Sequence, residues 1–123
     1  MIVAIRAEIS PPNSMLFISD SAGGGLSDYE DGKVIIANAS CITIRCLMEL
    51  DGPTELAMGA PEDVAFGGAL AFDGILETPN RVVVISTIVW DRVLEAAVPD
   101  TMTRIGIWIN HPTEPDRISV GLN

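Results

Sequence analysis

The stretch Arg81 to Val89 reads RVVVISTIV and is the most strand-like segment of this 123-residue chain. Its β-branched residues favour extended backbone. Side chains alternate between the two faces of a strand, and this stretch is apolar on both of them. Such a pattern is typical of a central strand that is covered on two sides. The segment therefore predicts a sheet packed between other layers.

Short apolar runs separated by turn residues continue on both sides of this stretch. Proline removes a backbone donor and glycine tolerates turn geometry, so both mark the ends of runs. Runs at this spacing are typical of a sandwich or barrel. We therefore expect one all-β domain over residues 1–123, an antiparallel two-sheet β-sandwich of about eight or nine strands with at most one short helix. The runs cover residues 2–9, 15–19, 34–37, 41–50, 55–58, 69–77, 104–110 and 117–122.

The run 41–50 alternates most clearly and predicts a half-buried strand. Two thiols in this run, Cys41 and Cys46, point to opposite faces and lie about 16 Å apart. A disulfide spans at most about 7 Å between Cα atoms, so we expect free thiols in a reducing compartment. The more apolar face carries Ile42, Ile44, Cys46, Met48 and Leu50.

Three further segments have local expectations of their own. Residues 90–97 read WDRVLEAA, and Val93, Leu94 and Ala97 would share one face of a helix of about two turns. No clear cap marks its start, so a strand is the alternative. Residues 59–68 predict a loop, and residues 55–58 predict a hairpin partner for the run 41–50.

Charge excludes several classes of function. The chain has 17 acidic and 7 basic residues, which gives a formal net charge of −10. A field of this sign repels phosphate backbones and anionic lipid surfaces, so we expect neither nucleic-acid binding nor membrane binding. It favours a basic protein partner. Apolar residues make up 48% of the chain, more than a small monomer hides easily, so we also expect a homo-oligomer.

The sequence also carries an expectation about cellular location. The first twelve residues, MIVAIRAEISPP, lack the basic leader and long apolar core of a signal peptide. No run reaches the roughly 18 apolar residues of a membrane span. We therefore expect a cytoplasmic protein.

An acidic loop over residues 20–32, DSAGGGLSDYEDG, is one candidate binding site. Asp28, Glu30 and Asp31 precede a glycine, as carboxylates do in loops that wrap a hard cation. A twelve-residue calcium loop starting at Asp28 would need glutamate at position 39, where Ala39 stands. A solvated acidic loop is the alternative, and we predict no metal or other cofactor.

The only histidine, His111, lies in NHPTEPD near Glu114 and Asp116. A facial iron triad needs two histidines, and no Gly-x-Ser-x-Gly elbow accompanies this one. The segment is most simply a turn. We therefore predict no catalytic residue and expect a protein that is not an enzyme.

Trp108 is the second candidate for binding. In RIGIWIN, residues 104–110, the isoleucines share one face of a strand and Trp108 lies on the other, more polar face. A tryptophan there either covers a second packed layer or anchors a partner.

The C-terminal third has, in order, Thr78 and Asn80 in a turn, an alternating strand through Ser86 and Ile88, then Leu94, Pro99 and a strand ending in Trp108. In these features the chain, from about Thr78 onwards, resembles the competence-J family of bacterial nuclease inhibitors, which are small acidic β-sandwich proteins. The resemblance covers the C-terminal third and implies a sandwich fold and a role in binding a protein. It transfers no individual site residue.

Three functional hypotheses follow. The first is a non-enzymatic protein-binding module, an acidic inhibitor or immunity-type protein for a basic partner, which the charge and the resemblance favour. The second is a self-associating structural or phage-like assembly protein, which the apolar composition favours. The third is an enzyme or small-ligand binder that would use His111 or the acids at residues 28–31.

Overall fold

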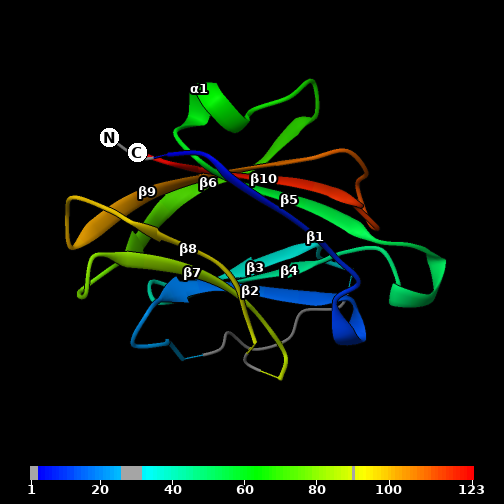
Figure 1. Cartoon of the computed structure of the whole chain (residues 1–123), viewed down its shortest axis with the longest axis horizontal. Helices are drawn as coiled ribbons and strands as arrows, with labels where there is room; N and C mark the ends of the chain where they lie inside the picture. Colours follow the sequence, from blue (N-terminus) through cyan, green and yellow to red (C-terminus); the bar gives the residue numbers. More distant parts are fainter. Residues whose placement is uncertain (1–2, 26–31, 90) are drawn as a thin grey trace.

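Ten strands lie in the residues that the computed structural model describes, which are 3–25, 32–89 and 91–123. They form two five-stranded sheets that pack face to face (Figure 1). Sheet A has the order β1 (Ile5–Ile9), β5 (Thr54–Gly59), β10 (Arg117–Leu122), β9 (Met102–Ile109) and β6 (Ala69–Glu77). Sheet B has the order β3 (Ile35–Ala37), β4 (Cys41–Arg45), β2 (Met15–Asp20), β7 (Val82–Thr87) and β8 (Arg92–Ala97).

The core lies between the sheets and comes from the alternate residues that face inward. The stretch that predicted a covered strand forms β7, five of whose six residues are buried, so both of its faces are covered. Burial of one large aliphatic side chain contributes roughly 1.5–3 kcal/mol, and many of them meet here. Fully buried members include Leu16, Ile18, Ile42, Ile85, Met58, Leu76, Ile105, Ile107, Ile118 and Val120.

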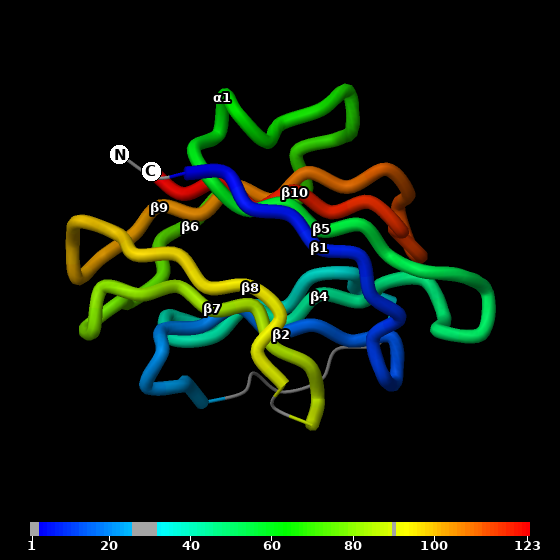
Figure 2. The backbone as a smooth tube through the Cα atoms, viewed as in Figure 1, coloured from blue at the N-terminus to red at the C-terminus, as the bar shows by residue number. Residues whose placement is uncertain are grey.

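The two-sheet sandwich is confirmed, and one of its pairings is parallel. β10 runs antiparallel to β9 and parallel to β5. Parallel neighbours need a long crossover, and the chain between Gly59 and Arg117 supplies it. The backbone leaves β5, turns through α1 (Pro61–Val64) outside sheet A, and returns as β6 (Figure 2).

The predicted strand 41–50 is too long. β4 ends at Arg45. Cys46 N–H still donates to Ser14 O, next to the paired Met15, but Leu47 N–H donates to Pro115 O, so the chain leaves sheet B there. The inward alternation is correct as far as Cys46. It fails beyond that point, since Met48 and Leu50 are exposed, Leu50 by 89%. A 3-10 turn (Glu49–Asp51) follows, and β5 then joins sheet A, so the predicted hairpin between residues 41–50 and 55–58 is wrong.

The one α-helix among the described residues lies in the segment 59–68, where a loop was predicted. Pro61 at its first position has the backbone angle a helix needs, and Glu62 and Asp63 in its first turn suit the positive end of the helix dipole. Of the two alternatives for the segment 90–97, the strand is confirmed and the helix is wrong, because β8 (Arg92–Ala97) forms there and pairs with β7. Pairing with a buried strand outweighs the weak helical preference of so short a segment. In the described part of the chain, no helix has the length and apolar character needed to cross a membrane.

Candidate functional site

The outer face of sheet A is only half covered. The helix α1 packs over β5 and β10 and buries Val64 against them (Figure 1). Small residues permit this close approach: a Cβ on Gly121 would lie 3.2 Å from Pro61 Cα. No helix among the described residues covers the other half, which β9 and β6 form.

Trp108 lies on the outer face, as the period-two pattern predicted. Ile105, Ile107 and Ile109 of the same strand point into the core. The indole ring lies against the glycines of β9 and β10, where Cβ atoms on Gly106 and Gly121 would come within 3.1 and 2.8 Å of its carbons. The ring is therefore half-buried and held in place by its own sheet.

Exposed apolar side chains continue from Trp108 along β6 and β9. Leu70 lies directly opposite Trp108, and Ile75 lies opposite Arg104. Leu70, Ile75 and Met102 are 53%, 51% and 54% exposed. Several exposed apolar side chains on one face of a sheet are a feature of interaction sites. We call this surface the Trp108 face, formed by Leu70, Asp73, Ile75 and Glu77 of β6 and by Met102, Arg104 and Trp108 of β9.

One ion pair crosses the Trp108 face. Arg104 donates from Nε to Asp73 Oδ1 at 2.8 Å and from Nη2 to Asp73 Oδ2 at 2.7 Å. These hydrogen bonds hold the pKa of Asp73 below its ordinary value and raise the pKa of Arg104. A hollow of about 270 Å³ lies between this pair, the indole and Pro61. The face therefore offers an apolar surface, one fixed ion pair and space for a side chain, which suits recognition of a protein.

The predicted acidic residues Asp28, Glu30 and Asp31 lie outside the described residues, and their role stays a prediction. The start of their loop is described as far as Gly25. Gly25 N–H donates to Ser40 Oγ, and Asn38 Nδ2 donates to Gly25 O. The turn between β3 and β4 therefore anchors the loop.

A buried carboxylate that the sequence did not single out lies at the end of β2. Asp20 accepts from Asn80 N–H at Oδ1 and from Ala22 N–H at Oδ2, both at 2.9 Å. Thr78 in the same turn donates from Oγ1 to Asp100 O at 2.8 Å. These contacts tie the turn before β7 to the ends of β2 and β8, so they give Thr78 and Asn80 structural roles. In the sequence, the only sign of this structural role was that Asp20 is a carboxylate at the boundary between a strand and a loop.

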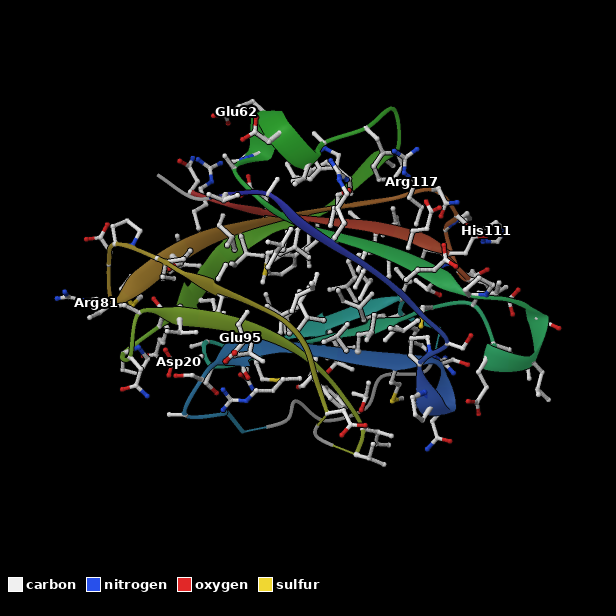
Figure 3. The ribbon with its side chains drawn as sticks, in the orientation of Figure 1. Asp20, Glu62, Arg81, Glu95, His111 and Arg117 are labelled. Carbon is white, nitrogen blue, oxygen red and sulfur yellow. The ribbon has the colours of Figure 1, made fainter. Side chains whose placement is uncertain are left out.

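His111 forms a turn, as its sequence predicted. Its Nδ1 accepts from Thr113 N–H at 3.2 Å and from Glu114 N–H at 3.0 Å. His111 lies near one end of the sandwich and Asp20 near the other (Figure 3). Within residues 3–25, 32–89 and 91–123, no three His, Cys, Asp or Glu side chains gather as metal ligands would.

The two thiols are buried on opposite faces of the chain at β4, as predicted. Cys46 belongs to the core between the sheets, whereas Cys41 lies on the outer side of sheet B. Burial raises the pKa of Cys41 and raises the pKa of Cys46 to about 11. Neither thiol has the lowered pKa of a nucleophilic cysteine.

The fold defines this chain as a ten-stranded β-sandwich in its described residues, with one outer face left half open. Within that class, it is similar to the crystal structure of ComJ, inhibitor of the DNA degrading activity of NucA, from Bacillus subtilis. The TM-score is 0.74 at 12% sequence identity, and the match covers 99% of this chain and 97% of that one. The resemblance predicted from residue 78 onwards is confirmed at the level of the fold and extends over the N-terminal two-thirds. No family model matches the sequence, and no curated protein matches it.

Proposed function

We propose that this protein is a non-enzymatic, acidic inhibitor that binds a basic nuclease. The observation that carries the proposal is the fold, which the chain shares over 99% of its length with an inhibitor of a DNA-degrading enzyme. We also propose that it works in the reducing cytoplasm, a location that suits two buried free thiols.

Electrostatics supports a nuclease as the partner. An enzyme that degrades DNA must present positive charge to the phosphate backbone. A protein of net charge −10 is complementary to that surface, and opposite charge speeds encounter and selects partners. The same charge keeps the inhibitor itself off DNA, so it competes for the enzyme and not for the substrate.

A DNA-degradation assay tests the proposal. The partners to use are purified basic nucleases of the host, with the full chain titrated into each reaction. We expect stoichiometric inhibition that weakens as salt concentration rises, because salt screens the attraction. A heat-unfolded sample of the same chain serves as control. Undiminished DNA degradation at low salt in the presence of excess folded chain would contradict the proposal.

A self-associating assembly protein is the second candidate, and the exposed apolar side chains of the Trp108 face favour it. Leu70, Ile75 and Met102 would be buried if two copies met there. Light scattering across a range of concentrations decides the matter. A particle mass equal to one chain at every concentration removes this candidate.

A further inference from the structure

β6 forms an edge of sheet A, and its hydrogen bonds show which backbone groups are open. In an antiparallel pair, alternate residues turn their N–H and C=O groups toward the neighbouring strand and away from it. Arg104 exchanges both backbone hydrogen bonds with Asn123, at 3.1 and 3.0 Å, so it faces away from β6. Ile75 lies opposite Arg104 and therefore points its groups out of the edge. Glu77 lies two residues after Ile75, so its backbone groups also point out of the edge. Its N–H donates to Ala39 O at 2.8 Å.

The same alternation leaves Asp73 open as well. Among the described residues, no backbone hydrogen bond outside the β6–β9 pairing joins Asp73 or Ile75 to a partner. Both residues are exposed, and both side chains lie on the Trp108 face. A nine-residue strand therefore presents two open pairs of donor and acceptor beside an apolar surface.

The other three edge strands, β1, β3 and β8, have features that disfavour the addition of a further strand. At β1, Glu55 N–H donates to Asp116 O, so Arg6 and Glu8 hold the open positions of that strand. Charged residues at open positions discourage strand addition. In sheet B, β3 has only three residues. β8 holds the charged residue Glu95 at an open position, because Val84 opposite it faces β2 and not β8. β6 is the longest of these four strands, and one of its two open positions, Ile75, is apolar.

We infer that β6 accepts an extended segment of a cationic partner protein as an added strand. The inference rests on the proposed function and names the surface that the partner would use. Main-chain hydrogen bonds to the edge supply affinity, and side chains that alternate along the added strand supply specificity. One side of that strand would lie over the Trp108 face.

Charge selects a cationic segment over a second copy of this chain. β6 and β9 carry two acids, Asp73 and Glu77, and one base, Arg104. The two neighbouring turns at the Glu77 end add one acid, Asp100, and one base, Arg81. A second copy brings the same net charge of −10 to this edge, and like charges oppose such a contact. A segment in which lysine or arginine alternates with apolar residues would match both the acids and Ile75.

The test uses the full chain and a synthetic peptide in which valine and lysine alternate. Ile75→Pro removes the open N–H and blocks the edge without breaking a hydrogen bond to β9. Arg6→Pro is the matched control, because it makes the same change on β1 and leaves the chain more acidic. We expect Ile75→Pro to weaken peptide binding by about tenfold or more and Arg6→Pro to leave it unchanged. Equal binding by Ile75→Pro and wild type would overturn the inference.

Hydrogen exchange of backbone amides in the wild-type chain tests the inference without depending on whether a variant folds. Bound peptide should slow exchange at Asp73 and Ile75 and leave Arg6 and Glu8 unchanged. Slowing only at β1 would refute the inference. A wild-type dimer that Ile75→Pro converts to monomer would also refute it, because the edge would then serve a second copy.

The nuclease assay separates this inference from the proposed function. If wild type and Ile75→Pro inhibit the nuclease equally, the edge inference fails and the proposed function stands. If wild type does not inhibit, the proposed function fails, and the peptide experiment still decides whether the edge accepts a strand. Glu77→Lys keeps the backbone intact and should weaken both peptide binding and inhibition.

Discussion

The position of Gly121 has no room for a Cβ, because Trp108 and Pro61 lie too close to it. A Cβ there would lie 2.8 Å from the Trp108 ring and 3.1 Å from Pro61 Cγ. We expect Gly121→Ala to destabilise the fold by about 1–3 kcal/mol, since the ring or the helix must move. Urea unfolding measures the change. Gly67→Ala is the control, because nothing lies within 4 Å of its Cβ position. A Gly121→Ala protein as stable as wild type would contradict this account of the packing.

Cys46 couples stability to alkaline pH. Its thiol has an ordinary pKa of 9.0, and burial raises that pKa to about 11 in the folded protein. Between these values the unfolded thiol loses its proton and the folded thiol keeps it. The contribution of this group to stability is therefore full below pH 9 and declines as pH rises through that window. Cys46→Ala should reduce the decline in the free energy of unfolding between pH 9 and 11, and an identical slope in both proteins would exclude this coupling.

At the scale of elements, position within a sheet sets local stability. β10 is the middle strand of sheet A and β2 is the middle strand of sheet B, so both have neighbours on two sides. We expect their amide protons to exchange most slowly with solvent and those of β3 to exchange fastest. Hydrogen exchange followed by NMR measures this order directly. Faster exchange in β10 than in β3 would be inconsistent with the strand order.

Local signals explain which elements the sequence could predict. The segments 69–77 and 117–122 were predicted with the bounds that β6 and β10 have, because alternation and flanking turns lie within each segment. The end of β4 was missed because it depends on Pro115, which is distant in sequence. Residues 90–97 were ambiguous because pairing with β7, rather than local preference, decides their form.

The candidate site also contains features that local sequence could predict and features that it could not. The outward position of Trp108 follows from the alternation of a single strand, and the sequence predicted it. The open positions Asp73 and Ile75 follow from the order of strands across sheet A, which no single segment specifies. Local sequence can thus show which side chains point outward, whereas only the assembled sheet shows which backbone groups remain unpaired.

At the scale of the whole molecule, the net charge of −10 acts on stability as well as on partners. Seventeen acids against seven bases repel one another in the compact state. Added salt screens this repulsion over a distance of about 10 Å at 0.1 M. We therefore expect the melting temperature to rise between low and moderate sodium chloride concentrations, measured by scanning calorimetry. A melting temperature that falls over this range would indicate that attractive ion pairs dominate.

The parallel contact between β5 and β10 has a consequence for biosynthesis. A ribosome makes β1 and β5 early, but β10 lies between β5 and the rest of sheet A. The edge of β5 that faces away from β1 must therefore stay unpaired until residue 122 has left the exit tunnel. Non-local pairing of this kind slows folding and leaves nascent polypeptide open to aggregation. We therefore expect newly made chains to be most prone to aggregation before β10 is in place.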